Sequence, residues 1–367
     1  MAARRTYTAG IVGTGRIGFS LGFDRKREQP ASHTMALLAE RRIQIASGCD
    51  TDAGRLSEWR RFVEKKSRRA VRACTGLEEF LAAPPPDIVV IAVNEGSHLP
   101  AALAVIGRRP RLVILEKPVA LNVREGRRIA DAAEAAGVPV LVNHERRFAE
   151  DYRLAARHLP KIGRLQTVQA RLDSGLRVYS AAEEQTGAYS LLHDGTHLVD
   201  AVLFLLEGAA AAASVPDAPP ALQEMQLSGI FRDSPSSDGG ASPQDSPGAV
   251  RSVSAHFRHP ACPDVNITIS GGSRFFGFEI DIIGTEGRIR IGNGVFSFFR
   301  REQSRLYTGF WSLAPDRSVR RPAKTRYFSN MVRNAADFLD GSAPLRSTLE
   351  DGLRTLEILE AVKNGLA

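Results

Sequence analysis

The feature that most constrains this chain is an apolar run that leads directly into a glycine pattern close to its first residue. Run and pattern together read Ala9-Gly10-Ile11-Val12-Gly13-Thr14-Gly15-Arg16-Ile17-Gly18. A strand, a G-x-G-x-x-G turn and a helix start, in that order, form the site that holds the pyrophosphate of a dinucleotide. The alternative is a glycine-rich turn that binds nothing, and the position of the pattern directly after a strand favours the dinucleotide site.

Each glycine of the pattern has a distinct expected task. Gly13 permits the tight turn, Gly15 lets the backbone approach the phosphates, and Gly18 lets the following helix pack close to the strand. Backbone N–H groups at the helix start then face the anion. The residues predicted to contact the cofactor here are Gly13, Thr14, Gly15, Arg16, Ile17 and Gly18.

The composition fits two ordinary globular domains. The chain has 367 residues, of which 43% are hydrophobic and 25% charged, and this length is enough for two separate cores. No stretch is expected to be long and apolar enough to cross a membrane, and the N-terminal residues read as a first strand rather than a signal peptide. Cys49, Cys74 and Cys262 have no metal-type spacing, so we expect reduced thiols and a cytoplasmic location.

The net charge of +8 raises the question of a nucleic-acid partner. The densest basic stretch lies between Arg60 and Arg72, and Leu56, Trp59 and Val63 recur there at helical spacing. This pattern predicts an amphipathic helix whose basic face is solvated. Because the stretch has no recognition motif, zinc pattern or interleaved exposed aromatic residues, we expect neither a nucleic-acid partner nor a membrane partner.

Strand and helix patterns alternate through residues 1–145, which predicts one doubly wound parallel sheet, the α/β Rossmann arrangement. The helix expected after Gly18 is delayed by a polar stretch, Phe19 to Ser32, which we interpret as an inserted loop. A helical pattern resumes at His33. The predicted strands are Tyr7–Val12, Ile43–Cys49, Val71–Cys74, Asp87–Val93, Arg111–Leu115 and Val138–Val142.

Further candidate cofactor contacts follow other predicted strands of this sheet. Asp50 and Thr51 follow the second strand, where an acid accepts hydrogen bonds from ribose hydroxyls. A carboxylate there repels a 2′-phosphate, so NAD is favoured over NADP, although Arg55 keeps NADP open. The alternative role for Asp50 is a helix N-cap, which Asp52 would fill equally well. Because open α/β sheets bind ligands at the carboxyl ends of their strands, the remaining candidates are Val93, Asn94, His98, Glu116 and Lys117.

The pattern changes after Asn143. Residues 146–326 contain many strand candidates with few helices between them, which predicts an α+β domain with a large, open and mostly antiparallel sheet. A stretch rich in Ser, Pro, Asp and Gly, Arg232 to Gly248, is predicted to be a loop. Residues 327–367 carry two helices that we expect to pack back on the domains, the second with capping-box spacing at Ser347 and Glu350. The predicted strands are Leu165–Leu172, Met225–Phe231, Val250–Phe257, Val265–Ser270, Phe278–Ile283 and Arg288–Ile291.

Four further segments, together with the glycine pattern, point to a known family. They are Glu116-Lys117-Pro118, Arg146-Arg147-Phe148, Leu192-His193-Asp194-Gly195-Thr196-His197-Leu198-Val199-Asp200 and Gly284-Thr285-Glu286-Gly287. In their order and spacing, the five segments resemble the Gfo/Idh/MocA family of NAD(P)-dependent oxidoreductases, the glucose–fructose oxidoreductase and inositol dehydrogenase group. The resemblance spans nearly the whole chain. It implies a homodimer or homotetramer, because open sheets of this kind commonly pair face to face.

The resemblance implies that Lys117 is the catalytic lysine, and its position after a predicted buried strand agrees. An ammonium there would hydrogen-bond the carbinol oxygen of a substrate, stabilise the oxyanion that develops and relay the proton. The resemblance also implies that the bond before Pro118 is cis. The alternative is a surface lysine in a turn before a helix.

The segment around His197 departs from the family pattern. His197 matches the catalytic or substrate-binding histidine, which we expect to be a general base or a hydroxyl ligand. The family commonly has an aspartate four residues earlier, where this chain has His193, and the acid has moved to Asp194. Because residues four apart share a helix face, His193 and His197 are predicted to point together into a cleft. There His193 would hold a substrate hydroxyl or relay a proton.

Alternatives remain for these residues. Two histidines at this spacing also suit zinc, but no third ligand is in place, so no metal is predicted. His193 is otherwise a core histidine, and Asp194 either orients a histidine, contacts substrate or caps the helix. Of the two arginines before Phe148, one is expected to form a structural ion pair, and Arg147 is assigned to the substrate. Candidate aromatic residues of a sugar-binding cleft are Tyr189, Tyr307 and Trp311, each of which also suits a core.

These observations predict an NAD(H)-dependent oxidoreductase acting on a secondary alcohol or ketone of a sugar, a cyclitol or a nucleotide-linked sugar. Lys117 and His197 are expected to converge over the nicotinamide ring. Two alternatives remain. One is a glycosidase-type enzyme of the same fold that retains NAD. The other is a non-catalytic NAD or sugar sensor.

Overall fold

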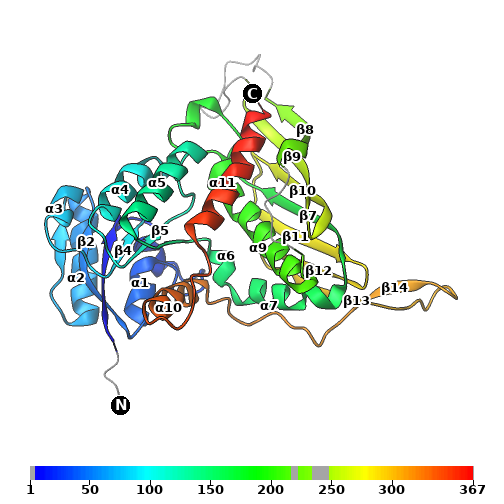
Figure 1. Ribbon diagram of the computed structural model, residues 1–367, viewed down its shortest axis with the longest axis horizontal. Helices are drawn as coiled ribbons and strands as arrows, with labels where there is room; N and C mark the ends of the chain where they lie inside the picture. The colour runs from blue at the N-terminus through cyan, green and yellow to red at the C-terminus, as the bar shows by residue number, and fades with distance from the viewer. Residues whose placement is uncertain (1–4, 216–221, 234–247, 367) are drawn as a thin grey trace. The chain divides into compact units, whose positions relative to one another are not determined.

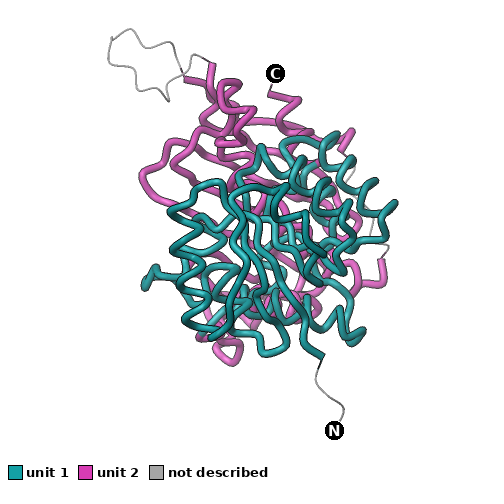
Figure 2. The backbone as a smooth tube through the Cα atoms, turned by 90° about the vertical axis from the view of Figure 1, so that its left-hand side faces the viewer, with its two compact units in different colours: residues 1–149, 324–356 teal, residues 150–323, 357–367 magenta. Residues whose placement is uncertain are grey.

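The computed structural model describes residues 5–215, 222–233 and 248–366. Its chain divides into two compact units, which Figure 2 shows in different colours. Unit 1 comprises residues 1–149 and 324–356, and unit 2 comprises residues 150–323 and 357–367. The C-terminal segment, which we expected to begin a third part at residue 327, is therefore divided between the two units.

Unit 1 is built on a six-stranded parallel sheet in the order β3-β2-β1-β4-β5-β6. The order reverses between β1 and β4, which is the topological switch point of a doubly wound fold. Every residue of β4, β5 and β6 is buried, as expected for parallel strands covered on both faces. The predicted Rossmann arrangement is thus confirmed. The strands are β1 Tyr7–Val12, β2 Ile43–Cys49, β3 Arg72–Cys74, β4 Ile88–Ile91, β5 Leu112–Leu115 and β6 Val140–Val142.

Three helices of unit 1, α1, α2 and α5, begin at a side-chain cap. Side chains of Ser32, Asp52 and Asn122 accept hydrogen bonds from backbone N–H groups three residues on, which satisfies the free donors of a first turn. The delay after Gly18 is confirmed, because a short 3-10 turn, η1 Ser20–Phe23, intervenes before the first α-helix. The helices are α1 His33–Ala39, α2 Ala53–Ser67, α3 Leu77–Leu81, α4 His98–Ile106, α5 Val123–Ala136 and α6 Glu145–Phe148, with the 3-10 turn η2 Glu95–Ser97 before α4 (Figure 1).

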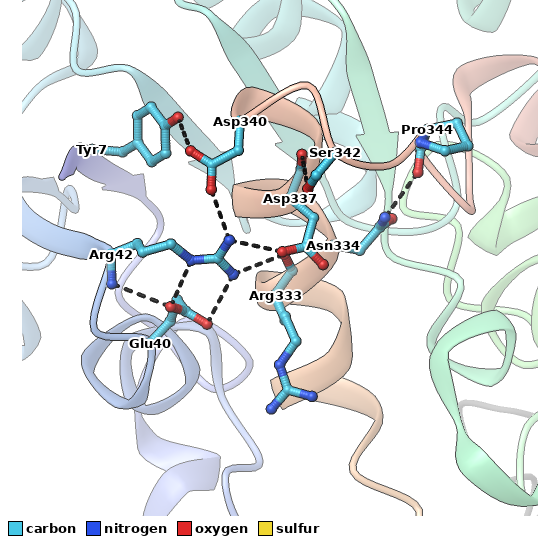
Figure 3. A network of polar contacts seen from close by, with 9 residues as sticks. All are labelled: Tyr7, Glu40, Arg42, Arg333, Asn334, Asp337, Asp340, Ser342 and Pro344. Atoms are coloured by element: carbon cyan, nitrogen blue, oxygen red, sulfur yellow. Dashed lines mark hydrogen bonds and ion pairs between the residues drawn. The ribbon is translucent and has the colours of Figure 1, made fainter. Parts of the chain in front are cut away.

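A helix from the far end of the chain, α10 (Tyr327–Leu339), completes the core of unit 1. Figure 3 shows the polar network that holds it. Arg42, just before β2, donates to Asp337 Oδ1 at 2.7 Å and to Asp340 Oδ2 at 2.9 Å, and the Tyr7 hydroxyl donates to Asp340 Oδ1 at 2.6 Å. Hydrogen bonds from Tyr7 and Arg42 lower the pKa of Asp340, so the carboxylate stays charged and the helix stays tied to the sheet.

Unit 2 contains an eight-stranded sheet in the order β14-β13-β12-β11-β7-β10-β9-β8. It is mostly antiparallel, with β7 and β10 paired in parallel. One face packs against α9 (Gly195–Ala213), and burial alternates along β10 and β11 because the other face is open. This confirms the predicted α+β sheet. The strands are β7 Leu165–Asp173, β8 Gln226–Arg232, β9 Val250–His259, β10 Cys262–Ser270, β11 Gly277–Gly284, β12 Gly287–Gly292, β13 Phe296–Gln303 and β14 Trp311–Pro315.

Two strands at one edge, β13 and β14, were missed by sequence reasoning. Apart from the buried Phe298, their side chains are half-exposed or exposed, so the sustained apolar–polar alternation that marks a half-buried strand is absent. β12 pairs with β13 only as far as Arg300, whereas β13 and β14 pair through Gln303. The end of this hairpin, residues 301–313, is therefore a two-stranded arm beyond the sheet (Figure 1). Most of the loop predicted at 232–248 lies outside the described residues.

The remaining helices correct two expectations. α8 and α9 together, Ser190–Ala213, are long and apolar enough to cross a membrane by length and composition, with mean hydropathy 1.4. The expectation that no stretch reaches this length is therefore wrong. However, 61% of the most apolar part of this stretch is buried, as in the core helix of a globular domain. The other helical elements of unit 2 are α7 Glu150–His158, η3 Leu159–Ile162, η4 Ala181–Glu183, α8 Ser190–His193 and η5 Leu222–Glu224.

The last helix, α11 (Leu349–Asn364), starts one residue later than the predicted capping box implied. Thr348 and Asp351 cap each other. Asp351 Oδ2 accepts from the Thr348 N–H at 2.6 Å, and Thr348 Oγ1 accepts from the Asp351 N–H at 3.2 Å. The pairing predicted for Ser347 and Glu350 is therefore wrong.

Candidate functional site

The glycine loop has the geometry of a dinucleotide cradle. Gly13 has a φ of +95°, and a Cβ there would lie 2.3 Å from the Ala92 carbonyl oxygen after β4. A Cβ at Gly18 would lie 2.0 Å from the Gly13 carbonyl oxygen, so Gly18 lets the loop close on itself. A Cβ at Gly15 would meet only Arg55 Nη1, at 3.8 Å. The loop thus fits a pyrophosphate, because Gly13 and Gly18 shape it and Gly15 leaves its backbone accessible.

Asp50, which follows β2, is bonded to the loop itself. Its Oδ2 accepts from the Thr14 N–H at 2.8 Å and from the Thr14 hydroxyl at 3.1 Å, and its Oδ1 accepts from the Asp52 N–H at 2.9 Å. Asp52 rather than Asp50 caps α2, through the Arg55 N–H at 3.0 Å. The guanidinium of Arg55 lies 3.7 Å from Asp50 Oδ1. Asp50 therefore holds a negative charge at the loop, with one cation beside it.

Lys117 follows β5, and β5 pairs with β4, which pairs with β1. Its side chain is half-buried between two buried residues, and the Lys117–Pro118 bond is cis, as the resemblance implies. Val93 is partly exposed and Asn94 exposed at the end of β4. The carboxyl ends of three neighbouring strands thus bring together the glycine loop, the residues after β4 and Lys117. Arg16 and Thr51, also predicted as cofactor contacts, are exposed.

His98 lies elsewhere than predicted. It is fully buried at the start of α4, with Nδ1 2.7 Å from the Pro118 carbonyl oxygen and Nε2 3.1 Å from the Val93 carbonyl oxygen. Burial lowers the pKa of His98, although its two carbonyl contacts favour the proton. A ring with no exposed surface cannot touch a dinucleotide, so the prediction of a cofactor contact is corrected. His98 instead ties together the loops after β4 and β5.

Glu116 is also buried rather than open to a cofactor. Its Oε1 accepts from His33 Nε2 and from Asn143 Nδ2, both at 2.6 Å. Sequence reasoning missed His33 and Asn143. His33 is the first residue of α1 and Asn143 follows β6, and no motif marked either one. The available signal was that Asn143, like Lys117, follows a strand of the parallel sheet.

Both arginines before Phe148 are buried, and each lies beside a carboxylate. The Arg147 guanidinium lies 3.3 Å from Asp351 Oδ1, so it takes part in a structural ion pair, and the substrate contact assigned to Arg147 stays a prediction. Arg146 lies 3.2 Å from Glu145. His144 is buried beside them. Burial, and then the charge of Arg147, lowers the pKa of His144 to about 3.

The polar residues predicted in unit 2 lie where α8 ends and α9 begins. His193 is the last residue of α8, and His197 lies in the first turn of α9. Asp194 separates the helices. Its Oδ2 accepts from the Ser174 hydroxyl at 2.5 Å, and its side chain does not cap α9. All three predicted residues are partly exposed.

The predicted cleft aromatic residues divide into two kinds. Tyr189 is buried with its ring edge-on to Tyr179 at 5.4 Å, and burial raises the pKa of Tyr189. Tyr307 and Trp311 are exposed on the arm. Within the described ranges, no three His, Cys, Asp or Glu side chains are arranged to hold a metal.

Comparisons with known proteins agree on one family. Residues 7–144 match the model of GFO_IDH_MocA, an oxidoreductase family with an NAD-binding Rossmann fold. Over 135 residues the chain is 27% identical to scyllo-inositol 2-dehydrogenase (NADP(+)) IolW of Bacillus subtilis (strain 168), covering 35% of this chain and 37% of that protein. Over 149 residues it is 29% identical to 1,5-anhydro-D-fructose reductase of Ensifer adhaerens, covering 39% and 44%. The match thus spans about two fifths of each relative.

The fold likeness extends over the whole chain. A dehydrogenase from Chromobacterium violaceum has a similar structure, with a TM-score of 0.74 and 16% sequence identity, covering 99% of this chain and 97% of that one. Residues 7–144 thus match the NAD-binding Rossmann part of the Gfo/Idh/MocA oxidoreductase family, and over the rest of the chain the likeness is one of fold.

Proposed function

We propose that this protein is an NAD(H)-dependent oxidoreductase that interconverts a secondary alcohol and a ketone on a sugar, a cyclitol or a nucleotide-linked sugar. The observation that carries the proposal is the position of Lys117 at the same strand ends as the glycine loop. The substrate class is supported by the two curated relatives, whose names describe an inositol dehydrogenase and an anhydrofructose reductase.

Lys117 is the residue assigned to the reacting oxygen. The nicotinamide, when bound, supplies the hydride acceptor or donor. The Lys117 ammonium donates a hydrogen bond to the substrate oxygen, stabilises the charge that develops there and exchanges the proton. His197 is assigned to hold or move the proton of a substrate hydroxyl, with His193 and Asp194 as hydroxyl ligands. The family resemblance and their partial exposure support these roles.

NAD is the proposed dinucleotide, although the Bacillus subtilis relative is named for NADP(+). The carboxylate of Asp50 lies against the loop and repels a 2′-phosphate, and Arg55 offsets that charge only from a distance of 3.7 Å. Asp50→Asn should keep an acceptor for Thr14 while removing the charge.

This choice is tested by titrating both dinucleotides by fluorescence. We expect Asp50→Asn to shift the ratio of the two dissociation constants toward NADP by about tenfold, which is roughly 1.4 kcal/mol. The matched control is Asp52→Asn, which removes a nearby charge that caps α2. An unchanged ratio in Asp50→Asn, or an equal shift in both variants, would contradict the assignment.

The activity itself is tested with a panel of sugars and cyclitols and both dinucleotides, followed by the absorbance of the reduced nicotinamide. Lys117→Met should lower kcat by about 10²- to 10⁴-fold and leave dinucleotide binding intact, whereas Lys65→Met, an exposed lysine on α2, should match the wild type. Inactivity with every polyol and both dinucleotides argues against the proposal. Glycoside cleavage without net reduced nicotinamide would favour the glycosidase alternative.

A further inference from the structure

Glu116 is a buried carboxylate that the proposed reaction does not use directly. Its Oε1 receives two hydrogen bonds of 2.6 Å, from His33 Nε2 and Asn143 Nδ2, and its Oε2 accepts from the Lys117 N–H at 3.3 Å. Because a carboxylate only accepts, His33 Nε2 must carry its proton. The carboxylate is thereby held from two sides and fixed to the backbone of Lys117.

The other side of Lys117 is held by a second buried histidine. His98 reaches the Pro118 carbonyl oxygen at 2.7 Å and the Val93 carbonyl oxygen at 3.1 Å. Both residues next to Lys117 are therefore fixed by buried side chains from other elements, α1 and α4. Lys117, between them, keeps a partly exposed side chain.

The network makes Glu116 an anion beside the Lys117 ammonium. Burial raises the pKa of Glu116, but the hydrogen bond and charge of His33, the hydrogen bond of Asn143 and the charge of Lys117 outweigh burial and lower it. The titratable groups whose charges act on Glu116 from the elements around it are His33, His98, His144 and Lys117. A negative charge held here attracts the Lys117 ammonium, the group that donates to a substrate oxygen in the proposed reaction.

The same helix start also touches the glycine loop. The Gly18 carbonyl oxygen accepts from the Thr34 N–H at 3.0 Å and from the Thr34 hydroxyl at 2.6 Å, and the His33 N–H donates to the Ile17 carbonyl oxygen at 3.1 Å. The first two residues of α1 thus contact the cofactor loop with one side chain and Glu116 with the other. The insertion at 19–32 leaves this contact intact, because the chain returns to the loop at His33.

We infer that His33 is a positioning residue, which acts through Glu116 to hold the Lys117 ammonium in place. This inference rests on the proposed function in one respect: it assumes that Lys117 meets the reacting oxygen. The link from His33 to Lys117 does not depend on that assumption and is measurable without substrate.

The test compares His33→Leu, which removes the donor, with His33→Gln, whose amide N–H₂ restores one. Competitive acetylation across a pH series, read by mass spectrometry of peptides, gives the titration midpoint of the Lys117 amine in each protein. We expect that midpoint to fall by about one pH unit in His33→Leu and to return toward the wild-type value in His33→Gln. Lys65 is the internal reference, and His256→Leu, which changes a partly exposed residue of β9 in unit 2, is the control variant.

A second variant keeps the test decisive if His33→Leu does not fold. Asn143→Ala removes the other donor to Glu116 and should shift the Lys117 midpoint in the same direction, with Glu116→Gln giving the largest shift. An unchanged Lys117 midpoint in a folded His33→Leu or Asn143→Ala protein overturns the inference.

Kinetics then separate this inference from the proposed function. If the polyol panel finds a substrate, His33→Leu should lower kcat more than it changes KM and add an acidic limb to the pH profile of kcat, because Glu116 becomes easier to protonate. If the panel finds no substrate but the Lys117 midpoint moves, the proposed function is wrong, while the link from His33 through Glu116 to Lys117 is supported.

Discussion

His144 is buried beside Arg147, and it is neutral in the folded chain. Burial, followed by the charge of Arg147, lowers the pKa of His144 to about 3, whereas a histidine in an unfolded chain titrates near ~6.5. Arg147 is itself paired with Asp351, so the positive charge that opposes protonation is fixed in place. A residue without catalytic assignment thereby makes stability depend on pH.

We expect the free energy of unfolding to fall as the pH is lowered from about 6.5 toward 4. In that window the unfolded chain binds a proton that the folded chain excludes, so stability is complete above the unfolded pKa and is lost below it, by about 1.4 kcal/mol per pH unit for one such group. His98, whose pKa burial also lowers, adds to the slope.

Urea denaturation at a series of pH values checks this dependence. His144→Gln removes one titrating group and should give a shallower dependence on pH, whatever its effect on stability at neutral pH. An equal slope in the variant and the wild type would show that folding does not lower the pKa of His144.

At the scale of elements, the strand–loop–helix unit at the start of the chain separates structural glycines from a ligand glycine. A Cβ at Gly18 would overlap the backbone of Gly13, while a Cβ at Gly15 would point into open space near Arg55. The two positions look alike in sequence. They differ because the loop folds back on itself at one of them and faces outward at the other.

Alanine at Gly15 should therefore affect dinucleotide binding, whereas alanine at Gly18 should affect stability. Gly15→Ala should keep the melting temperature of the wild type and weaken NAD binding by at least about tenfold, because its methyl group occupies the path of the phosphates. Gly18→Ala should destabilise the fold by more than about 3 kcal/mol, because backbone atoms must move. Thermal unfolding and dinucleotide titration measure both. A stable Gly18→Ala protein, or unchanged binding by Gly15→Ala, would contradict these roles.

At the scale of the whole molecule, the arm of β13 and β14 carries a group of exposed apolar side chains. Its large exposed apolar residues are Leu306, Tyr307, Phe310, Trp311 and Leu313. A two-stranded hairpin is marginally stable alone, and exposed apolar patches mark interaction sites. The open face of the same sheet carries opposite charges in pairs, Asp281 with Arg288 and Glu279 with Arg290. Because these charges are already paired within the chain, a second copy of this chain could cover the face without leaving an unpaired charge.

We therefore expect a homodimer or homotetramer in solution, with the arm in the interface. Combining Leu306→Ser, Phe310→Ser and Trp311→Ser should reduce the mass measured by light scattering to that of a smaller species. Phe23→Ser, which changes an exposed apolar residue of unit 1, should leave the mass unchanged. A monomeric wild type, or an arm variant with the wild-type mass, would contradict the expectation.

Much of this architecture was predictable because its signals are local. The glycine pattern predicted the loop that Gly13 and Gly18 shape, and unbroken apolar runs predicted the buried strands. Edge strands without alternation, such as β13 and β14, gave no such signal. Burial of His98 and Glu116 was not predictable either, because both occupy positions where the fold class usually places ligand contacts.

By itself, the sequence determined the order of strands and helices, the glycine loop and the residues that follow each strand, because periodicity and backbone freedom act over a few neighbouring residues. Only the tertiary structure decided which partner each buried charge takes. Arg147 meets Asp351, Glu116 meets His33 and Asn143, and α10 reaches back to Arg42. These partners are far apart in the chain. They meet because a buried charge is stable only where packing brings it a matching group.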